Sequence, residues 1–158
     1  MIRPQLGLLL PRSLERYAGP RIAFWLLAAY NVPATIRSLV HILAPDSGAG
    51  SIAGMDTTVA GGANAIALLA QWGGAQLLMA LMIWVALWRY PGLVPLMVLG
   101  SLADNVLRVA VGQVKPLVTE HTPPGAASWI LIPLLAVLLV VSLMPAQPHA
   151  SDGWRPQR

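Results

Sequence analysis

Four long apolar segments divide this chain of 158 residues, and they constrain its fold more than any other feature. In chain order they cover residues 22–43, 63–88, 93–114 and 126–144. At 1.5 Å per residue, a helix of roughly 20 residues crosses the hydrocarbon core of a bilayer, which is about 30 Å thick. Backbone groups in lipid must be hydrogen-bonded within their own segment, so such spans are helices. The sequence therefore predicts an all-α membrane protein, a four-transmembrane-helix bundle forming a single integral membrane domain.

The composition agrees with this fold class. Hydrophobic residues make up 56% of the chain and charged residues only 10%, whereas about a quarter of the residues of soluble domains are charged. The absence of cysteine excludes disulfides, thiolate metal sites and thiol nucleophiles. The net charge of +4 could indicate nucleic acid, but the basic residues lie mostly near the ends of the spans. We therefore expect no nucleic-acid partner.

The basic residues also predict the orientation. Four arginines precede the first span within residues 1–21, Arg89 lies in the short turn between the second and third spans, and two more lie in residues 145–158. The long connection at 44–62 carries two aspartates and no basic residue. The positive-inside rule then makes both termini cytoplasmic, with 1–21 as a leader, 145–158 as a tail and 44–62 as an outer loop. Because arginine far outnumbers lysine and alanine and glycine are abundant, we expect a bacterial inner (cell) membrane.

The turns between spans have clear signals. A Tyr-Pro-Gly sequence at residues 90–92 ends the second span, because the residue before proline resists helical geometry and glycine permits a tight turn. The second and third spans should therefore form an antiparallel hairpin. Pro33 and Pro133 lie inside spans and should kink them.

Two alternatives concern the start of the chain. Residues 1–34 could be a signal peptide cleaved after a Val-Pro-Ala sequence at 32–34, although hydrophobicity continues through residues 39–44. The segment 6–17 combines leucines with two arginines one helical turn apart, and could lie on the inner surface as a short amphipathic helix.

Polar side chains interrupt three of the four spans. Ionisable groups at membrane depth cost at least a few kcal/mol each, so they face a protein interior or a wet cavity and are functional candidates by default. With the predicted topology, these side chains reach a similar level in the outer half of the bilayer, which predicts an outward-facing polar pocket. The candidate ligand-binding residues are Arg37, His41, Asn64, Gln71, Asp104, Asn105 and Arg108.

The charges within this set do not balance. Two arginines face one aspartate, Asp104, and an unpaired charge is not tolerated in a low dielectric. A second anion is therefore expected. It could be Asp46 or Asp56 folding inward, Glu120 from the other outer loop, or the carboxylate, phosphate or lipid head group of a ligand. Arginine suits bidentate recognition of such groups.

A purely structural interpretation is equally open at this point. Asp104 and Arg108 lie one helical turn apart and could form an ion pair within one helix, hydrogen-bonded to Asn105 and Gln71, that only holds helices together. The Gly-Gly-Ala sequence at 73–75 favours close helix packing.

Signals for catalysis and for metal binding are weak. No phosphate-binding loop, hydrolase elbow, metalloprotease helix or dinucleotide fingerprint occurs. A metal site from His41, Asp46, Glu120 and His121 is disfavoured because no ligand spacing recurs. We therefore expect no catalytic residue, no metal and no cofactor.

Three features carry a resemblance to a known group. They are a polar-capped first span with an acidic outer loop, the small-residue stretch Gln-Trp-Gly-Gly-Ala-Gln at 71–76, and a third span that contains Arg108 and follows a tight turn. The arrangement resembles small four-helix bacterial inner-membrane proteins, DoxX-like and related uncharacterised families. The resemblance implies varied roles, including association with quinone-linked oxidation, and carries over no catalytic residue.

The sequence thus predicts a non-catalytic multi-pass inner-membrane protein, an accessory or small-ligand- and lipid-binding component. One alternative is an oligomeric transporter subunit, since four helices seldom enclose a pathway alone. Another is a quinone-linked or other membrane enzyme subunit in which Asp104 or His41 handles a proton. The expected partners are membrane lipid, an anionic or lipid-like small molecule, and a homo-oligomer or larger membrane complex.

Overall fold

The computed structural model describes residues 3–120 and 122–146, and within them every regular element is helical. The α-helices are α1 (Arg21–Leu43), α2 (Gly62–Arg89), α3 (Val94–Val114) and α4 (Ser128–Ser142). The short 3-10 helices are η1 (Leu6–Leu8), η2 (Pro91–Leu93) and η3 (Pro124–Ala127). The all-α prediction is confirmed, and the bounds of all four α-helices lie within two residues of the predicted spans.

Each of the four long helices, with η2 and η3 included, is long and apolar enough to cross a membrane. At most 28% of the most apolar stretch of each helix is buried. Large apolar side chains such as Leu68, Ile130 and Val137 are about two-thirds exposed at 65%, 67% and 64%. Apolar surface on this scale is unusual on a soluble monomer and is the normal lipid-facing surface of a membrane bundle. The fold is that of a multi-pass membrane protein.

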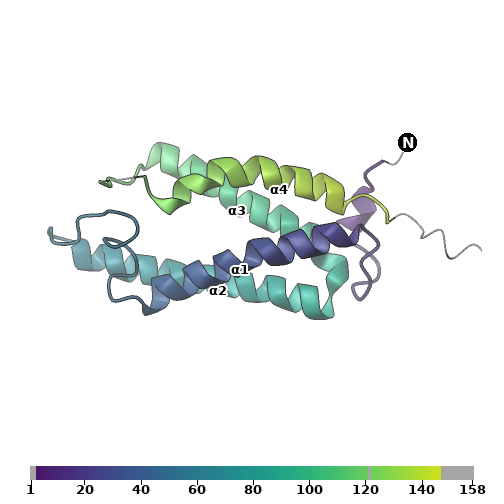
Figure 1. The fold of residues 1–158 in the computed structure, drawn as a ribbon, viewed down its shortest axis with the longest axis horizontal. Helices are drawn as coiled ribbons and strands as arrows, with labels where there is room; N and C mark the ends of the chain where they lie inside the picture. Colours follow the sequence, from purple (N-terminus) through teal and green to yellow (C-terminus); the bar gives the residue numbers. More distant parts are fainter. Residues whose placement is uncertain (1–2, 121, 147–158) are drawn as a thin grey trace, which may run out of the picture.

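The helices are arranged as two pairs (Figure 1). α1 packs along α2, and α3 packs along α4, whereas contacts between the two pairs are fewer. At one end lie residues 3–20, the α2–α3 turn and residues 143–146, which we call the leader end. At the other end lie residues 44–61 and the α3–α4 connection, which we call the loop end. The two pairs approach each other at the leader end and separate toward the loop end (Figure 1).

The second and third spans were predicted to pack together as an antiparallel hairpin, and this part of the prediction is wrong. The turn at 90–92 forms as expected, and α2 and α3 run in opposite directions, but they contact each other little. α2 packs against α1 instead, because its small residues let α1 approach. A Cβ added at Gly73 would lie 2.5 Å from Cβ of His41 and 3.1 Å from the carbonyl oxygen of Ser38. The close-packing interpretation of the Gly-Gly-Ala stretch is confirmed at this glycine.

Polar contacts reinforce the α1–α2 pair. The buried Asn31 donates from Nδ2 to the carbonyl oxygen of Ala80 at 2.9 Å, and Nε1 of Trp84 donates to Oγ1 of Thr35 at 3.0 Å. α1 is continuous across residues 32–34, and Asn31 and Ser38 are buried on either side of that segment. The stretch considered as a cleavage site is thus an integral part of the bundle.

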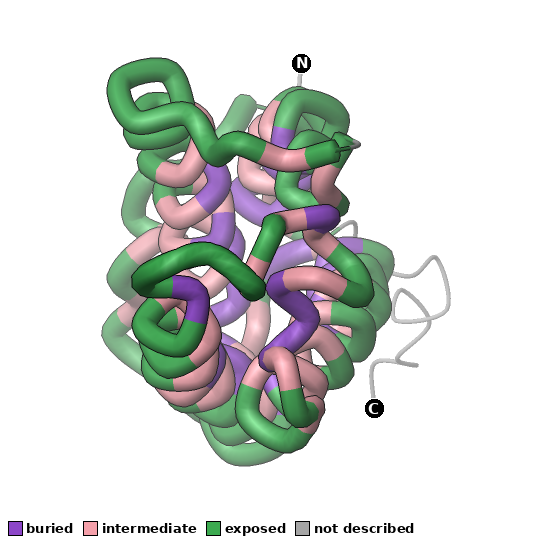
Figure 2. Tube along the Cα trace, turned by 90° about the vertical axis from the view of Figure 1, so that its left-hand side faces the viewer, coloured by how far each residue is buried: buried purple, intermediate pink, exposed green. Residues whose placement is uncertain are grey.

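The hydrophobic core lies toward the leader end. Figure 2 shows the buried positions gathered between the helices and the exposed ones outside. The core draws on all four long helices, from the first half of α1 and α3 and the second half of α2 and α4. Its members are Ala23, Leu27, Ile83, Leu87, Val94, Val98, Leu135 and Leu138. This core joins the two pairs at the leader end, where they approach each other.

The leader forms no amphipathic helix, so that expectation is wrong. Apart from η1 it is irregular, because Pro4 and Pro11 lack the amide hydrogens that a helix of this length needs. Its backbone instead bonds to the rest of the leader end, for example from the amide of Gly92 to the carbonyl oxygen of Leu14 at 2.9 Å. The hydroxyl of Tyr17 donates to the carbonyl oxygen of Ser142 at 2.9 Å, and burial raises the pKa of Tyr17.

Candidate functional site

An ion pair on α3 lies at the centre of the site. Nη2 of Arg108 donates to Oδ2 of Asp104 at 2.6 Å, across one helical turn. The Arg108 side chain is only 13% exposed, while that of Asp104 is 43% exposed. The predicted intrahelical pair is therefore present, with its cation deeper than its anion.

Gln76 of α2 connects this pair to Arg37 of α1. The side-chain amide of Gln76 is oriented with its oxygen toward the two guanidinium groups, so that an acceptor faces N–H donors. In this orientation, Oε1 lies 3.1 Å from both Nη1 and Nη2 of Arg108 and 3.2 Å from Nη2 of Arg37. One neutral oxygen thus accepts from two cations that belong to different helices.

Trp72, one turn before Gln76 on α2, supplies an aromatic face. The Cζ atom of Arg108 lies 4.7 Å from the centroid of the Trp72 ring, and that of Arg37 lies 5.9 Å away. Both distances are within the range of cation–π attraction. We call Arg37, Trp72, Gln76, Asp104 and Arg108 the arginine cluster.

Arg37 has no carboxylate partner within this cluster. The ion pairs among the residues that the structure describes are Arg108–Asp104 and Arg89–Glu15. In addition, the Nε atoms of Arg37 and Arg108 are buried and have no hydrogen-bond partner. The cluster therefore holds one excess positive charge and unused donors.

The two aspartates of the connection at 44–61 do not fold inward, so that expectation is wrong. Asp46 instead accepts from the amides of Gly48 and Ser51, at 2.9 and 2.7 Å. These hydrogen bonds lower the pKa of Asp46 to about 2. Asp56 accepts from the amide and hydroxyl of Thr58, which also lowers its pKa. Both carboxylates are held within their own loop.

Glu120 reaches the same loop only through its backbone. Its amide donates to the carbonyl oxygen of Gly54 at 2.8 Å, which joins the two connections at the loop end. Its carboxylate forms no ion pair with a described residue. Of the candidates for the missing anion, those left are the ligand groups, namely a carboxylate, a phosphate or a lipid head group.

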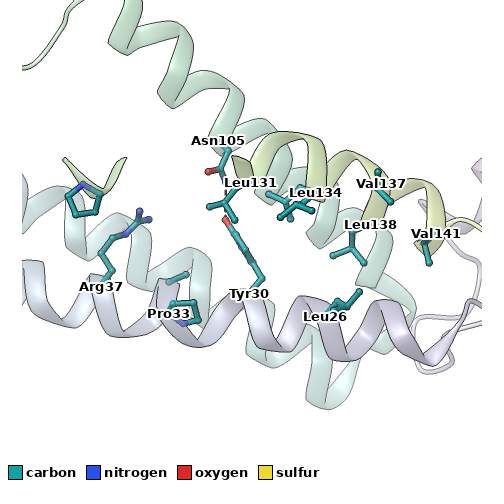
Figure 3. Close-up of a pocket in the computed structure, with 13 residues that line it drawn as sticks. Leu26, Tyr30, Pro33, Arg37, Asn105, Leu131, Leu134, Val137, Leu138 and Val141 are labelled. Atoms are coloured by element: carbon teal, nitrogen blue, oxygen red, sulfur yellow. Dashed lines mark hydrogen bonds between the residues drawn. The ribbon is translucent and has the colours of Figure 1, made fainter. Parts of the chain in front are cut away.

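Three cavities meet at Arg37, which lines each of them. The largest, about 630 Å³, lies between α1 and α4, and we call it the interpair cavity. Figure 3 shows Arg37 at one side of this cavity, Tyr30 and Asn105 near its middle beside Leu131, and leucine and valine side chains from there to the other side. Its apolar lining includes Leu26, Leu131, Leu134, Leu135, Val137, Leu138 and Val141. This is the lining of a site for an apolar chain with a polar end.

The second cavity, about 510 Å³, lies at the loop end. It is bordered by α1, α2, α3 and both loop-end connections, and Trp72 and Arg108 join Arg37 in its wall. It shares Pro33 and Pro124 with the interpair cavity. The third cavity, about 240 Å³, lies on the Asp104 and Gln76 side of Arg37.

The other predicted site residues fall in different places. Asn105 is buried and joins three helices: its Nδ2 donates to the Tyr30 hydroxyl at 3.0 Å, and its Oδ1 accepts from Oγ of Ser128 at 2.9 Å. His41 lies 2.7 Å from the carbonyl oxygen of Ser47 through Nδ1, which must donate because a carbonyl oxygen only accepts. His41 also lines the loop-end cavity.

Asn64 and Gln71 lie apart from the cluster. Both are exposed on α2 and line none of the three cavities. The expected bond from Gln71 to the ion pair is made by Gln76 instead. A signal for Gln76 was present in the sequence, because Gly73, Gln76 and Ala80 follow helical spacing and form one face of α2.

No group of three histidine, aspartate or glutamate side chains that could hold a metal occurs among residues 3–120 and 122–146. His121, one member of the grouping considered from sequence, lies outside the described residues. Comparisons with family models, curated proteins and solved structures gave no match. The resemblance to DoxX-like families therefore stays a prediction, and the function is argued from the geometry of the site.

Proposed function

We propose that this protein is a non-catalytic membrane protein that binds an anionic, lipid-like molecule. The anionic head lies against Arg37 and Arg108, and the apolar part occupies the interpair cavity. The observation that carries this proposal is the Arg37 guanidinium, which has no carboxylate partner among residues 3–120 and 122–146 and lies where three cavities meet.

Charge and shape support the same ligand class. An unpaired guanidinium in a low dielectric is costly, and breaking a buried pair typically costs about 3–5 kcal/mol. An anion would remove that penalty and use the free donors of the cluster. A cavity of about 630 Å³ is within the size range of small-molecule sites. Apart from Arg37, Tyr30 and Asn105, its lining is apolar, which favours an amphiphile over a fully polar anion.

The distribution of charge between the two ends supports an outward-facing site. Exposed arginines lie at the leader end, namely Arg12, Arg16, Arg21 and Arg89, whereas the loop-end connection at 44–61 carries aspartates. By the positive-inside rule the loop end faces outward, so the cavity at that end opens away from the cytoplasm. In a bacterial inner membrane the ligand would arrive from the outer side.

The groups considered for catalysis are committed to structure. Asp104 pairs with Arg108, and Nδ1 of His41 donates to Ser47. These bonds favour a binding role over proton handling. A transporter subunit is the second candidate, because the loop-end and interpair cavities share Pro33, Arg37 and Pro124 and so form one route past the cluster.

Native mass spectrometry of the protein released from its own membranes tests the proposal. The wild type should carry an amphiphile adduct, Arg37→Gln should lose it, and the matched control Arg21→Gln should keep it. Arg21 is an exposed arginine on the same helix, remote from the cavities. An adduct-free wild type, or an adduct that survives Arg37→Gln, would overturn the proposal. Uptake driven by an ion gradient in liposomes would favour the transporter instead.

A further inference from the structure

We infer that the ligand head carries a single negative charge, as a carboxylate does, and that it binds by taking the place of the Gln76 amide oxygen between Arg37 and Arg108. This inference rests on the proposed function and specifies its ligand.

The charge of the cluster selects a monoanion. Arg37 and Arg108 contribute two positive charges and Asp104 one negative charge, so one unit remains. A monoanionic head cancels it. A phosphate monoester carries about −1.5 to −2 at pH 7 and would leave an excess of negative charge instead. Uncharged and zwitterionic heads leave the imbalance in place.

Gln76 marks where the head oxygen goes. Its Oε1 is an acceptor within 3.2 Å of both guanidinium groups, and it is neutral. A carboxylate adds to these hydrogen bonds the attraction between opposite charges and the bidentate geometry that suits a guanidinium. A carboxylate also has two oxygens, and the two buried, unpartnered Nε atoms lie on these same arginines. The cluster therefore favours exchange of an amide oxygen for a carboxylate.

The interpair cavity defines the rest of the molecule. Arg37 lies toward one side in Figure 3, and Leu26, Leu138 and Val141 lie toward the other. Along α1, Leu26 and Arg37 are about 16 Å apart at 1.5 Å per residue. No charged side chain other than Arg37 lines this cavity among the described residues. A long unbranched chain attached to the carboxylate fits that length and lining.

A panel of three amphiphiles with one shared chain tests the head charge. Hexadecanoate, hexadecyl phosphate and hexadecanol are titrated into the purified protein in maltoside micelles, at a pH where the acid is ionised, with binding read by native mass spectrometry. Hexadecanoate should bind roughly tenfold or more tightly than the others, the effect of one charge-assisted hydrogen bond. Equal or tighter binding of the phosphate or the alcohol overturns the monoanion inference but leaves the proposed function standing. No binding of any of the three, together with an adduct-free protein from native membranes, removes the proposed function as well.

A substitution tests the place of the head. Gln76→Glu supplies the missing charge from within the chain, so the ligand-free protein should unfold at a higher temperature than the wild type and bind hexadecanoate at least about tenfold more weakly. Gln71→Glu adds the same charge to an exposed position of α2 and should bind like the wild type. Undiminished binding by Gln76→Glu would overturn the inference. If that variant fails to fold, the panel on the wild type still decides the head charge.

Discussion

Asp104 and Arg37 should differ sharply in what they contribute to stability. Asp104 balances the charge of Arg108, whereas Arg37 adds to the excess positive charge of the cluster. Asp104→Asn leaves Arg37 and Arg108 facing each other around Gln76 with no anion. The variant also loses the attraction of the Arg108–Asp104 pair, which for two opposite charges about 4 Å apart at an effective dielectric constant near 20 is about 4 kcal/mol. Since the Asp104 side chain is 43% exposed, the carboxylate is partly solvated and the expected loss is smaller. We expect about 2 kcal/mol.

Arg37→Gln acts in the opposite sense. It removes the unpaired cation and leaves Arg108 paired with Asp104, so the free energy of unfolding should change by less than about 1 kcal/mol, or rise. In the double variant Arg108 is the one charged residue of the arginine cluster, so the net charge of the cluster is +1, as in the wild type. The two substitutions should therefore be non-additive, with a coupling energy of about 1 kcal/mol or more.

Equilibrium unfolding of the three variants in mixed detergent micelles gives these free energies as a double-mutant cycle. The control is Glu15→Gln, which removes the acid of the exposed Arg89 pair and should cost at most about 1 kcal/mol. If Arg37→Gln destabilises the protein as much as Asp104→Asn, or if the cycle is additive, Asp104 is not the central counter-ion.

The remaining predictions concern the two loop-end features that border the site. Gly73→Ala should destabilise the α1–α2 pair by about 1–3 kcal/mol, because its Cβ would lie 2.5 Å from that of His41; Gly74→Ala, with open space around it, should be neutral or stabilising in the same unfolding assay. The pKa of Asp46 is lowered by its backbone hydrogen bonds to about 2, so its contribution to loop order is present above the ordinary carboxyl pKa of about 4 and is lost as the pH falls toward 2. The protection of the Gly48 amide, measured as its exchange rate relative to the intrinsic rate at each pH, should then fall with acidification in the wild type, whereas in Asp46→Asn this pH-specific loss should be absent.

The sequence predicted which helices carry the site residues, but not the direction in which each side chain points. Gln71 and Gln76 lie in the same helix, yet five residues place them about 140° apart around it. The sequence-based choice of Gln71 therefore selected a side chain on the lipid-facing side. Only the packing of α2 against α1 through Gly73 determines that Gln76 and Trp72 face the arginines.

The source of the missing anion shows the same limit. Counting charges within the spans predicted an excess of one positive charge, and among the described residues Arg37 indeed has no ion-pair partner. Whether Asp46 or Asp56 could correct it depended on the loop, and there backbone amides compete for the carboxylates at 2.7–2.9 Å. Local turn geometry of this kind is not visible in a count of charges.

The sequence by itself determined that four apolar helices form, where they end, and that Arg37, Asp104 and Arg108 lie within them. These features follow from local properties: the length of each apolar segment, the positions of proline and glycine, and the need for internal hydrogen bonds in lipid. Local properties can be inferred from the sequence alone. The pairing of α1 with α2 and α3 with α4 depends on which faces fit together, and tertiary structure alone decided it. That pairing separates the two pairs toward the loop end and places Arg37, which has no carboxylate partner in the described part of the chain, where three cavities meet.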